Sequence, residues 1–342
     1  MSVARLESAD AIVSGLVQKP ELPAWIYSKS VLWTCVFITY SVTMFALPGF
    51  VAWRVWEGDW PLVVKLPVML LLTMLAQQGL HLLGWVGHEG FHLNLHRNNV
   101  ASAVLGIVFS SMVASFMEIG AAASHWNHHL HTNQKDDPDI AIFVRFRTLA
   151  SRLLVARTYA NFLYRRNTLA LIRGRQLPYA TFLPFSAEVV RRLAWVNVIC
   201  GLFWIGVYVG ATIRWPAYGV AAIVVPHVLA SLYTGIRSFL EHAETEVGDF
   251  VNARSRTSWV LSVLYFCNNY HLEHHLYPSV ACYRLPAIHR YLAASGLYSR
   301  TGARIDRTLS SAYKLASSRF QYPAAVTTKD AEVRSAGGGI AS

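Results

Sequence analysis

Three clusters of histidines are the part of this sequence with the clearest capacity for chemistry. The chain has 14 histidines, and ten of them lie in the segments HEGFHLNLH (88–96), HWNHHLHT (125–132) and HLEHH (271–275). Residues three or four positions apart share a face of a helix, so each H-x-x-H-H group can align three imidazoles. Imidazole binds zinc, iron and copper alike. A closed zinc site takes four ligands, so eight or more imidazoles at this spacing predict two metal ions.

The first cluster also permits a different interpretation. HEGFH matches the His-Glu-x-x-His pattern of zinc proteases, in which two histidines bind zinc and the glutamate activates water. Glu89 would then be the general base. That site needs a third ligand, but no later apolar run contains an aspartate, and the two H-x-x-H-H groups would have no role. We therefore disfavour a protease.

Four histidines lie outside the clusters. We expect His81, His227 and His289 to be hydrogen-bonded core or surface residues, because this is the usual state of an isolated histidine. His81 and His227 fall inside apolar runs, however, where polar groups are unusual and often functional. His242 follows the last of these runs.

The composition is that of a membrane protein. Hydrophobic residues make up 54% of the chain and charged residues 14%, against about 25% charged residues in ordinary globular proteins. A hydrocarbon core about 30 Å thick requires roughly 20 helical residues. Four uncharged runs are long enough to cross it: 31–53, 66–87, 193–213 and 217–236.

The distribution of charge predicts how these runs are oriented. Between residues 145 and 192 there are ten arginines and a single acidic residue, Glu188. Basic loops face the cytoplasm, so this polar loop should lie there, and the short connections at 54–65 and 214–217 should lie on the opposite side. The four runs then form two hairpins, with both chain ends and the whole stretch 88–192 in the cytoplasm.

A fifth apolar run, 98–117, conflicts with this topology if it crosses the membrane once, because the arginine-rich loop would then change sides. Its many small and polar residues, and Glu118 after it, suit a segment partly buried in protein. We interpret it as a re-entrant or interfacial helix. The predicted fold is an all-α membrane protein with four transmembrane helices in two hairpins, re-entrant or interfacial helices, and a cytoplasmic histidine-rich cap.

The chain ends and the cysteines complete the predicted organisation. We expect a cytoplasmic N-terminal segment (1–29) without a cleavable signal peptide, a single membrane domain (30–316) and a disordered tail (317–342). The four cysteines form no C-x-x-C pair, which favours small apolar residues in a reducing compartment.

The segments HEGFH, HWNHHLHTNQKDDPD and NNYHLEHHLYP resemble the three histidine boxes of the membrane fatty acid desaturase-like family. The resemblance covers roughly residues 60–290 and includes the two-hairpin layout. It implies a non-haem di-iron centre that uses O2. It also implies one ligand after the last span, which RSFLEH matches at His242. The ligands implied are His88, His92, His125, His128, His129, His242, His271, His274 and His275.

Other residues near the boxes are candidates for supporting roles. Asp136, Asp137 and Asp139 follow box two and could accept the second ring N–H of ligating imidazoles, although solvated loop acids are an equally good interpretation. His131 and Asn269 are expected outside the ligand set but beside it, Asn269 also as a water-mediated ligand. His96 remains open as a substitute ligand. The aromatic residues that flank the boxes, for which plain packing is the simpler interpretation, are Trp85, Phe91, Trp126 and Tyr270.

The resemblance implies an O2-dependent oxidoreductase. The first hypothesis is a desaturase that acts on an acyl chain or similar aliphatic group. The alternative is a hydroxylase or ketolase of the same fold that acts on a lipid, a carotenoid or a small metabolite. Box one has three residues between its histidines, which argues against the stearoyl-type acyl-CoA subgroup. Box three begins with His in place of Gln, which argues against the front-end subgroup. A metal transporter is disfavoured because the polar groups gather at one face.

The electrons must come from a partner. The sequence has no His-Pro-Gly-Gly motif of a fused cytochrome and no C-x4-C-x2-C pattern of an iron–sulfur protein. A separate ferredoxin or cytochrome-type donor is therefore expected, and the arginine-rich loop could bind it through opposite charge or could bind anionic lipid. Membrane lipid and a hydrophobic substrate complete the expected partners. No nucleic-acid partner is expected.

Overall fold

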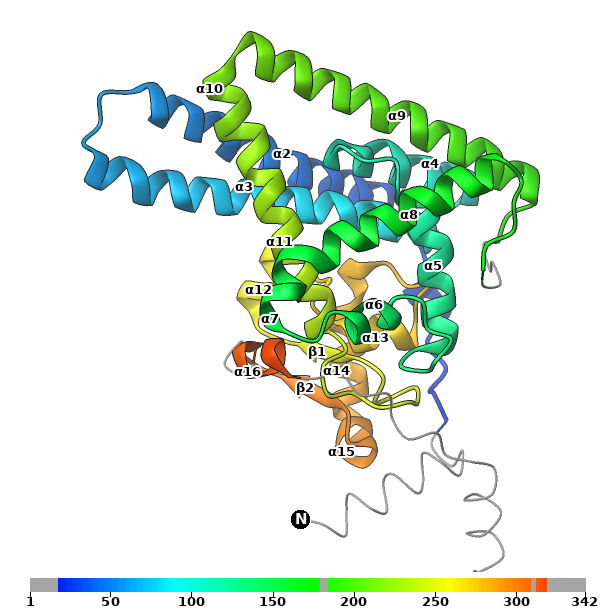
Figure 1. Cartoon of the computed structure of the whole chain (residues 1–342). Coiled ribbons are helices and arrows are strands. Elements are labelled where there is room, and N and C mark those ends of the chain that lie inside the picture. The colour runs from blue at the N-terminus through cyan, green and yellow to red at the C-terminus, as the bar shows by residue number, and fades with distance from the viewer. Residues whose placement is uncertain (1–17, 179–183, 309–311, 319–342) are drawn as a thin grey trace, which may run out of the picture.

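The computed structural model describes residues 18–178, 184–308 and 312–318, and this part of the chain is mostly helical (Figure 1). Four long helices are apolar enough to cross a membrane. They contain the four predicted runs and extend beyond each of them. They are α2 (Val31–Glu57), α3 (Leu62–Phe91), α9 (Ala187–Arg214) and a continuous helix formed by α10 (Pro216–Tyr218), the π-helical η4 (Gly219–Val224) and α11 (Val225–Leu240).

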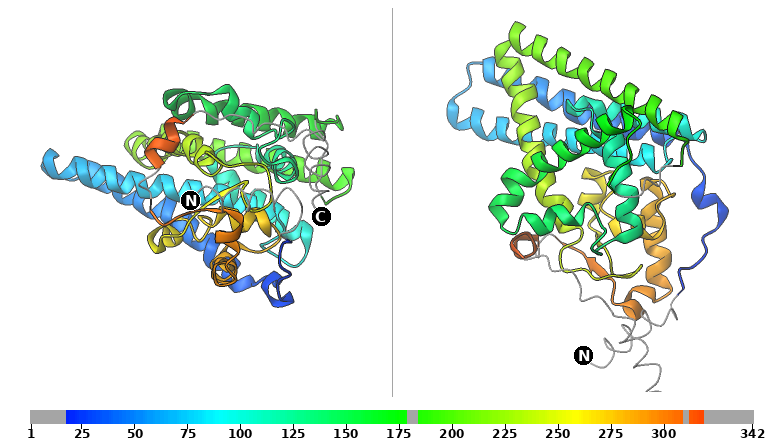
Figure 2. Two further views of the ribbon diagram at one scale, coloured as in Figure 1. Left: turned by 90° about the horizontal axis from the view of Figure 1, so that it is seen from below. Right: turned by 45° about the vertical axis from the view of Figure 1, so that its right-hand side comes forward.

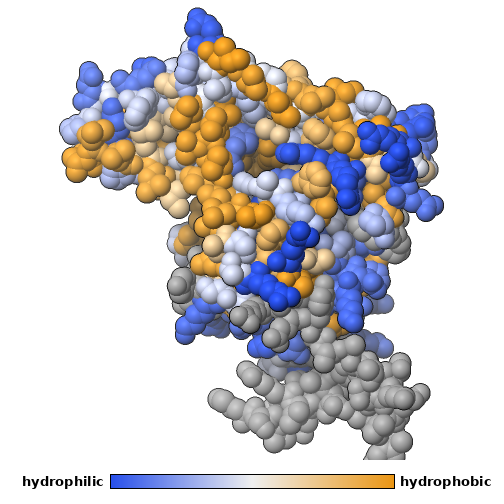
Figure 3. Space-filling view, viewed as in Figure 1, coloured by the Kyte–Doolittle hydropathy of each residue, from blue (hydrophilic) through white to orange (hydrophobic). Residues whose placement is uncertain are grey.

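The long helices form the two predicted hairpins. Both hairpin turns lie at the same end of the molecule, where the rings of Trp53 in α2 and Tyr218 in α10 pack edge to face with centroids 5.4 Å apart. α2 and α3 cross closely, because a Cβ added at Gly79 would lie 2.2 Å from the backbone nitrogen of Phe45. In Figure 3 apolar side chains run along this helical layer, with polar ones at its ends and over its right half, and further polar ones lie on the lower part of the molecule.

The run 98–117 does not form a straight span. It is divided into α4 (Asn99–Ser110) and η2 (Ser111–Val113), and α5 (Glu118–His131) then leaves at an angle of 113°. The small polar residues are buried inside the protein, since Ser102, Ser110 and Ser111 have no exposed surface. This bend is the geometry expected of a re-entrant segment or of a broken span.

The arginine-rich stretch that connects the two hairpins is largely helical, which its charge alone did not indicate. It contains the last part of α6 (Ile140–Arg145), then α7 (Leu149–Ser151), the π-helical η3 (Arg152–Ala156) and α8 (Arg157–Ile172). The physical reason is an apolar and small-residue face on α8, where Ala160 and Tyr164 are buried. That face lies against α5, where a Cβ at Gly120 would meet the carbonyl oxygen of Tyr164.

A C-terminal lobe (residues 241–308) covers one end of the helical layer, while the α2–α3 hairpin projects beyond it in both views of Figure 2. The lobe contains one parallel two-stranded sheet, which the all-α prediction missed because each strand has only three residues. A short turn, η1 (Ala24–Tyr27), precedes α2. The lobe elements are β1 (Arg254–Arg256), α12 (Trp259–Leu264), α13 (His271–Leu276), η5 (Cys282–Arg284), α14 (Leu285–Ala294), α15 (Leu297–Thr301) and β2 (Arg304–Asp306).

A last helix, α16 (Ala312–Ser317), is attached by a buried arginine. The guanidinium of Arg152 donates to the carbonyl oxygens of Ala316 (2.8 Å) and Ser318 (2.6 Å) and lies 3.5 Å from the ring centroid of Phe239. The predicted disordered tail begins at 317, so its first two residues belong to this attached segment. Residues 319–342 and 1–17 lie outside the described residues.

The crossing of α3 and α4 depends on a glycine pair and yields a first prediction. A Cβ added at Gly90 would lie 2.6 Å from the Cα atom of Gly106 and 2.9 Å from the carbonyl oxygen of Ser102, both in the α4 backbone. Backbone cannot move aside as a side chain can, and overpacking costs about 1–3 kcal/mol. We expect Gly90→Ala to lower the melting temperature of the detergent-solubilised protein by roughly 3–10 °C.

Gly84→Ala is the matched control on the same helix, since nothing lies within 4 Å of its added Cβ. Both changes gain the same helix propensity of about 1 kcal/mol, so only the contact with α4 differs. An equal melting temperature for the two variants would contradict the close crossing.

Candidate metal centre

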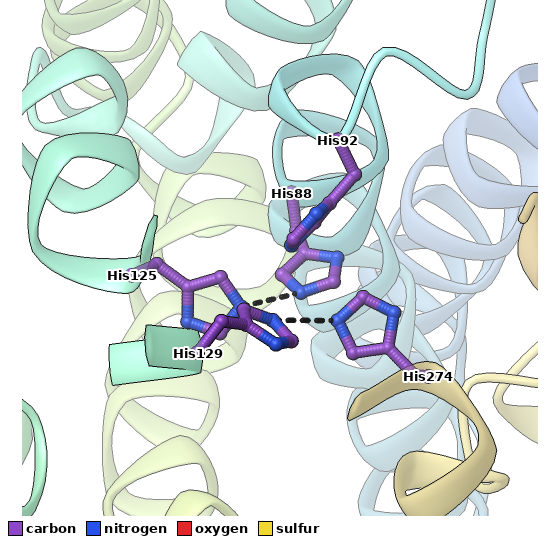
Figure 4. A group of neighbouring side chains, drawn as sticks. All are labelled: His88, His92, His125, His129 and His274. Carbon is purple, nitrogen blue, oxygen red and sulfur yellow. Dashed lines mark hydrogen bonds between the residues drawn. The ribbon is translucent and has the colours of Figure 1, made fainter. Parts of the chain in front are cut away.

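Histidines from all three predicted boxes come together in two adjoining clusters. We define the first cluster as His88, His92, His125, His129 and His274, and a compact set of three, His128, His242 and His275, as the core of the second. Within each set, one nitrogen of every ring lies within 4.8 Å of one nitrogen of every other ring. Figure 4 shows the rings of the first cluster pointing toward one another from α3, α5 and α13.

The nitrogen–nitrogen distances in the first cluster match those of ligands around one metal ion. The Nε2 atom of His125 lies 2.9 Å from that of His88 and 3.0 Å from that of His129, and the Nε2 atoms of His129 and His274 are 3.1 Å apart. Metal–nitrogen bonds of about 2.1 Å separate neighbouring donors by about 3.0 Å at right angles and about 3.4 Å in a tetrahedron. The observed spacing therefore suits nitrogen donors that share one metal ion.

Buried ring nitrogens without a hydrogen-bond partner give independent support for a metal ion at this site. His92 is 2% exposed, and neither of its ring nitrogens has a hydrogen-bond partner. Burying a polar atom without a partner costs about 1–3 kcal/mol, and a metal ion would satisfy it. Burial lowers the pKa of His129, His274 and His275 well below the ordinary value, so these rings are neutral at pH 7, the state that binds metal.

The second cluster gains a fourth ring from His271. Its Nε2 atom lies 3.1 Å from that of His242 and 3.2 Å from that of His275. The clusters adjoin, because the ring centroids of His129 and His275 are 4.3 Å apart. The nine histidines implied by the resemblance therefore divide into five and four around two neighbouring positions.

Helix geometry explains which ring joins which cluster. At 3.6 residues per turn, positions i+3 and i+4 lie on opposite sides of position i. In α5 the i and i+4 residues, His125 and His129, share the first cluster, and His128 at i+3 enters the second. In α13 the i and i+4 residues, His271 and His275, share the second cluster, while His274 at i+3 enters the first.

The end of α3 is shaped to present its two histidines. His92 is the C-cap, and the next residue, Leu93, has a positive φ of 62°. The N–H of Asn94 then donates to the carbonyl of Glu89 (2.9 Å), and that of Leu93 donates to Gly90 (3.2 Å). These two bonds form a Schellman motif. The motif ends the helix directly after the His88–His92 pair.

Two carboxylates, the buried Asp137 and the half-buried Asp139, orient the α5 histidines from behind. The Nδ1 atom of His128 lies 2.8 Å from Asp137 Oδ2, and that of His125 lies 3.4 Å from Asp139 Oδ2. A ring that donates from Nδ1 keeps Nε2 free for a metal. Burial alone would lower the pKa of His128, but the charge and hydrogen bond of Asp137 outweigh it, and the net pKa is raised.

Asp137 is also the centre of the loop after α5. It is completely buried, and its carboxylate accepts the backbone N–H groups of Asn133 (2.9 Å), Asp139 (3.0 Å) and Ile140 (3.0 Å) in addition to His128. Of the two interpretations of these loop acids, a solvated surface position does not apply to Asp137. It does apply to its neighbour Asp136, which is exposed.

Residues that the sequence did not suggest hold the other histidines. His242 Nδ1 lies 2.9 Å from the carbonyl oxygen of Asn252, and the Asn133 amide donates to that same oxygen (3.0 Å) and to Glu246 (2.7 Å). This links box two to the loop after the last span. The link joins residues more than 100 positions apart, so no local pattern could indicate it.

Glu273, inside the third box, anchors α13 from its other face. It is completely buried, and its carboxylate accepts hydrogen bonds from Ser255, from His289 Nδ1 (2.5 Å) and from the Tyr298 hydroxyl (2.5 Å). His289 is thus hydrogen-bonded, as expected of an isolated histidine. The place of an acidic residue inside HLEHH, between His271 and His274, was the available signal for Glu273 in the sequence.

Three candidates lie apart from the clusters. His96 accepts the N–H of Asn98 through Nδ1 (3.0 Å) and belongs to neither cluster. His131 also belongs to neither. The Asn269 amide donates to the carbonyl of Arg256 (2.5 Å), and no hydrogen bond to a clustered ring is found for it in the described part of the chain.

Glu89 does not occupy the position of a protease base. Its Oε2 atom accepts the N–H of Cys282 (3.0 Å), and its Oε1 atom lies 3.6 Å from Nδ1 of His88, the nitrogen remote from the cluster. The carboxylate therefore lies behind His88 and connects α3 to the C-terminal lobe.

A cavity of about 260 Å³ opens from both clusters and continues between α3, α5, α8 and α11. Trp85, Phe91 and Trp126 line it, and Tyr270 does not; Tyr270 belongs to the core instead. His81 and His227 also line the cavity. His81 Nε2 accepts from Trp85 Nε1 (3.0 Å) and faces Arg237 (2.8 Å), so it is a hydrogen-bonded residue of the wall.

Comparison with known families agrees with this geometry. No curated protein matches the chain closely enough to serve as a relative. The family model for fatty acid desaturases matches residues 59–306, which include both clusters and the cavity. Members of this family are oxidoreductases of the desaturase and hydroxylase type. The chain therefore belongs to the fatty acid desaturase family.

Proposed function

We propose that the protein is an O2-dependent, non-haem di-iron membrane desaturase that introduces a double bond into an acyl chain or similar aliphatic group. The observation that carries this proposal is that two adjoining histidine clusters open into one cavity in a member of the desaturase family. The overall reaction is R–CH2–CH2–R′ + O2 + 2 electrons + 2 H⁺ giving R–CH=CH–R′ + 2 H2O, with both electrons supplied by an external donor.

The nine clustered histidines are the proposed ligands, five for one iron and four for the other. A pair of bound iron ions would supply the redox chemistry with O2 that an unactivated C–H bond requires. The protein's own part is geometric. Asp137 and Asp139 hold the box-two rings, Glu273 holds the box-three helix, and the cavity walls place one carbon beside the clusters and exclude water.

We further propose a multi-pass membrane protein whose clusters face the cytoplasm. The positive-inside rule supports this orientation, and in it the bent pair α4–α5 is re-entrant. Residues 1–29 would be a cytoplasmic segment, 30–316 the membrane domain and 317–342 a disordered tail.

A ferredoxin or cytochrome-type protein is the proposed electron donor. Opposite charge would guide its binding, and the exposed arginines of residues 145–192 are the candidate contacts: Arg145, Arg147, Arg166, Arg173, Arg175, Arg191 and Arg192. Membrane lipid head groups are the second proposed partner of the same arginines.

The alternative is a hydroxylase or ketolase of the same fold that acts on a lipid, a carotenoid or a small metabolite. One observation favours it: the cavity wall carries charged and amide groups, among them Glu118, Arg157 and Asn161. Insertion of oxygen consumes O2, 2 electrons and 2 H⁺ and gives R–OH and a single H2O.

Expression with a ferredoxin system tests both forms of the proposal. Lipids and metabolites are compared by mass spectrometry with those of a His274→Ala control. We expect a product about 2 Da lighter than its precursor for a desaturase, against about 16 Da heavier for a hydroxylase, and no product from the control. Metal analysis should give about two irons per chain, and a single zinc would contradict the proposal.

A further inference from the structure

The wall of the cavity contains polar groups that the fold itself does not satisfy. Glu118 is 6% exposed, and its Oε1 atom is buried without a hydrogen-bond partner. The Oδ1 atom of Asn161 is buried and unpaired in the same way. Arg157 lines the same cavity, and among the described residues its guanidinium makes neither a hydrogen bond nor an ion pair.

The position of Glu118 at the start of α5 does not explain why one of its oxygens is buried without a partner. An acidic side chain in the first turn of a helix is favoured by the helix dipole, and Ser110 hydrogen-bonds to this carboxyl, but its Oε1 atom remains without a partner. Burial raises its pKa to about 7 despite the nearby charge of Arg157. An unsatisfied buried group of this kind costs about 1–3 kcal/mol, which a bound ligand would recover.

The three groups lie at a defined distance from the clusters. Glu118 and His125 both face the cavity from α5 and are seven residues apart, a rise of about 10 Å. Arg157 and Asn161 face it from one turn of α8. The cavity is also lined by small side chains of α5, η3 and α8: Ala121, Ala122, Ala156 and Ala160.

The size of the cavity limits what can fill it. Its volume of about 260 Å³ lies just below the range of roughly 300–1,000 Å³ typical of pockets for drug-sized ligands. A compact molecule fits this space. A purely hydrocarbon chain would leave Glu118 Oε1 and Asn161 Oδ1 buried without a hydrogen-bond partner.

The charges limit the polar group of the ligand. A carboxylate could pair with Arg157 but would face the Glu118 carboxyl, and an ammonium group would face the Arg157 cation. A neutral group that both donates and accepts satisfies both, with its oxygen accepting from Arg157 and its N–H or O–H donating to Glu118 Oε1.

We propose that the cavity binds a compact aliphatic substrate whose amide or hydroxyl group pairs with Glu118, Arg157 and Asn161 about 10 Å from the carbon to be oxidised. This inference rests on the proposed function, because it assumes that the oxidised carbon lies beside the histidine clusters. It selects one substrate class: a neutral, polar-substituted aliphatic molecule in place of a plain hydrocarbon chain.

The test is binding of four matched probes: octanamide, 1-octanol, octanoate and n-nonane. Each is equilibrated with lipid nanodiscs that contain the protein, and retention above that of protein-free nanodiscs is measured by gas chromatography. We expect octanamide or 1-octanol to be retained, and n-nonane and octanoate to be retained at least about 10-fold more weakly. Equal retention of n-nonane, or preference for octanoate, would overturn the proposal.

Variants assign the selectivity to these residues. Arg157→Met should weaken retention of the polar probes about 10-fold or more. Arg166→Met, an exposed arginine on the same helix, should leave retention unchanged. Glu118→Gln keeps the shape of the side chain and should alter the ratio between octanamide and 1-octanol. Equal effects of Arg157→Met and Arg166→Met would count against the site.

Iron content and product formation, measured on the same samples, separate the two proposals. Two irons and a product without probe selectivity would refute the polar substrate alone. Probe selectivity in a protein that binds no iron would refute the di-iron function and leave the polar site standing.

Discussion

The His242→Ala protein is expected to contain about one iron per chain where the unmodified protein contains about two, and to lose oxidase activity by at least about 100-fold. His242 is buried and belongs to the second cluster, which has four rings and therefore no spare donor. The first cluster has five rings of its own and should keep its ion. Iron is measured on purified protein by plasma mass spectrometry.

Two histidines from the same boxes provide the controls. His96 and His131 belong to neither cluster, so His96→Ala and His131→Ala should both retain about two irons and their activity. Retention of two irons by His242→Ala would contradict the division into five and four ligands. Loss of iron from His96→Ala would show that a histidine outside the two clusters also binds iron.

Asp137→Asn is expected to weaken iron binding by roughly 10–100-fold and to lower the stability of the iron-free protein by about 3 kcal/mol. The carboxylate accepts four hydrogen bonds, from His128 and three backbone N–H groups. An amide at this position has one acceptor oxygen, and its NH2 group would face donors. His128 would lose the partner that orients it, and the loop after α5 would lose its centre.

Iron titration with a competing chelator measures the first effect and thermal unfolding the second, where about 3 kcal/mol corresponds to roughly 6–12 °C. Asp136→Asn is the matched control, because Asp136 is the exposed neighbour in the same loop. It removes the same charge and should change neither quantity appreciably. Similar effects for both variants would mean that net charge near the site, and not the hydrogen bonds of Asp137, determines iron affinity and stability.

The prediction of four long apolar helices is confirmed, because each of these segments carries enough information by itself. Each apolar run was long enough to require a membrane-length helix, and each of the four helices is present. The polar loop at 145–192 was judged by its charge alone, and its helical parts were missed. The apolar and small-residue face of α8 becomes visible only when α5 is there to cover it.

The candidate site followed the same pattern. Histidine spacing correctly indicated rings that share a face, and the match of RSFLEH indicated a further ring after the last span, which lies within the second cluster. The sequence indicated only some of the residues that hydrogen-bond to those rings or hold their helices. Asp137 and Asp139 lie close enough in sequence to their histidines to be suspected, whereas Asn252 and Glu273 act through contacts that only the folded chain creates.

The sequence by itself determined the membrane class of this protein, its long helices and the imidazoles able to bind metal, because hydropathy and i, i+4 spacing are local properties of a helix. Only the tertiary structure decided which cluster each ring enters: His128 lies in a different cluster from the other box-two ligands, and His274 in a different cluster from the other box-three ligands. It also decided that Glu118, Arg157 and Asn161 line one cavity. The physical reason is that a helix fixes the direction of each side chain but not the helix opposite it. Which donors share an ion, and which polar groups are buried without a partner, depend on how α3, α5, α8, α11 and α13 pack.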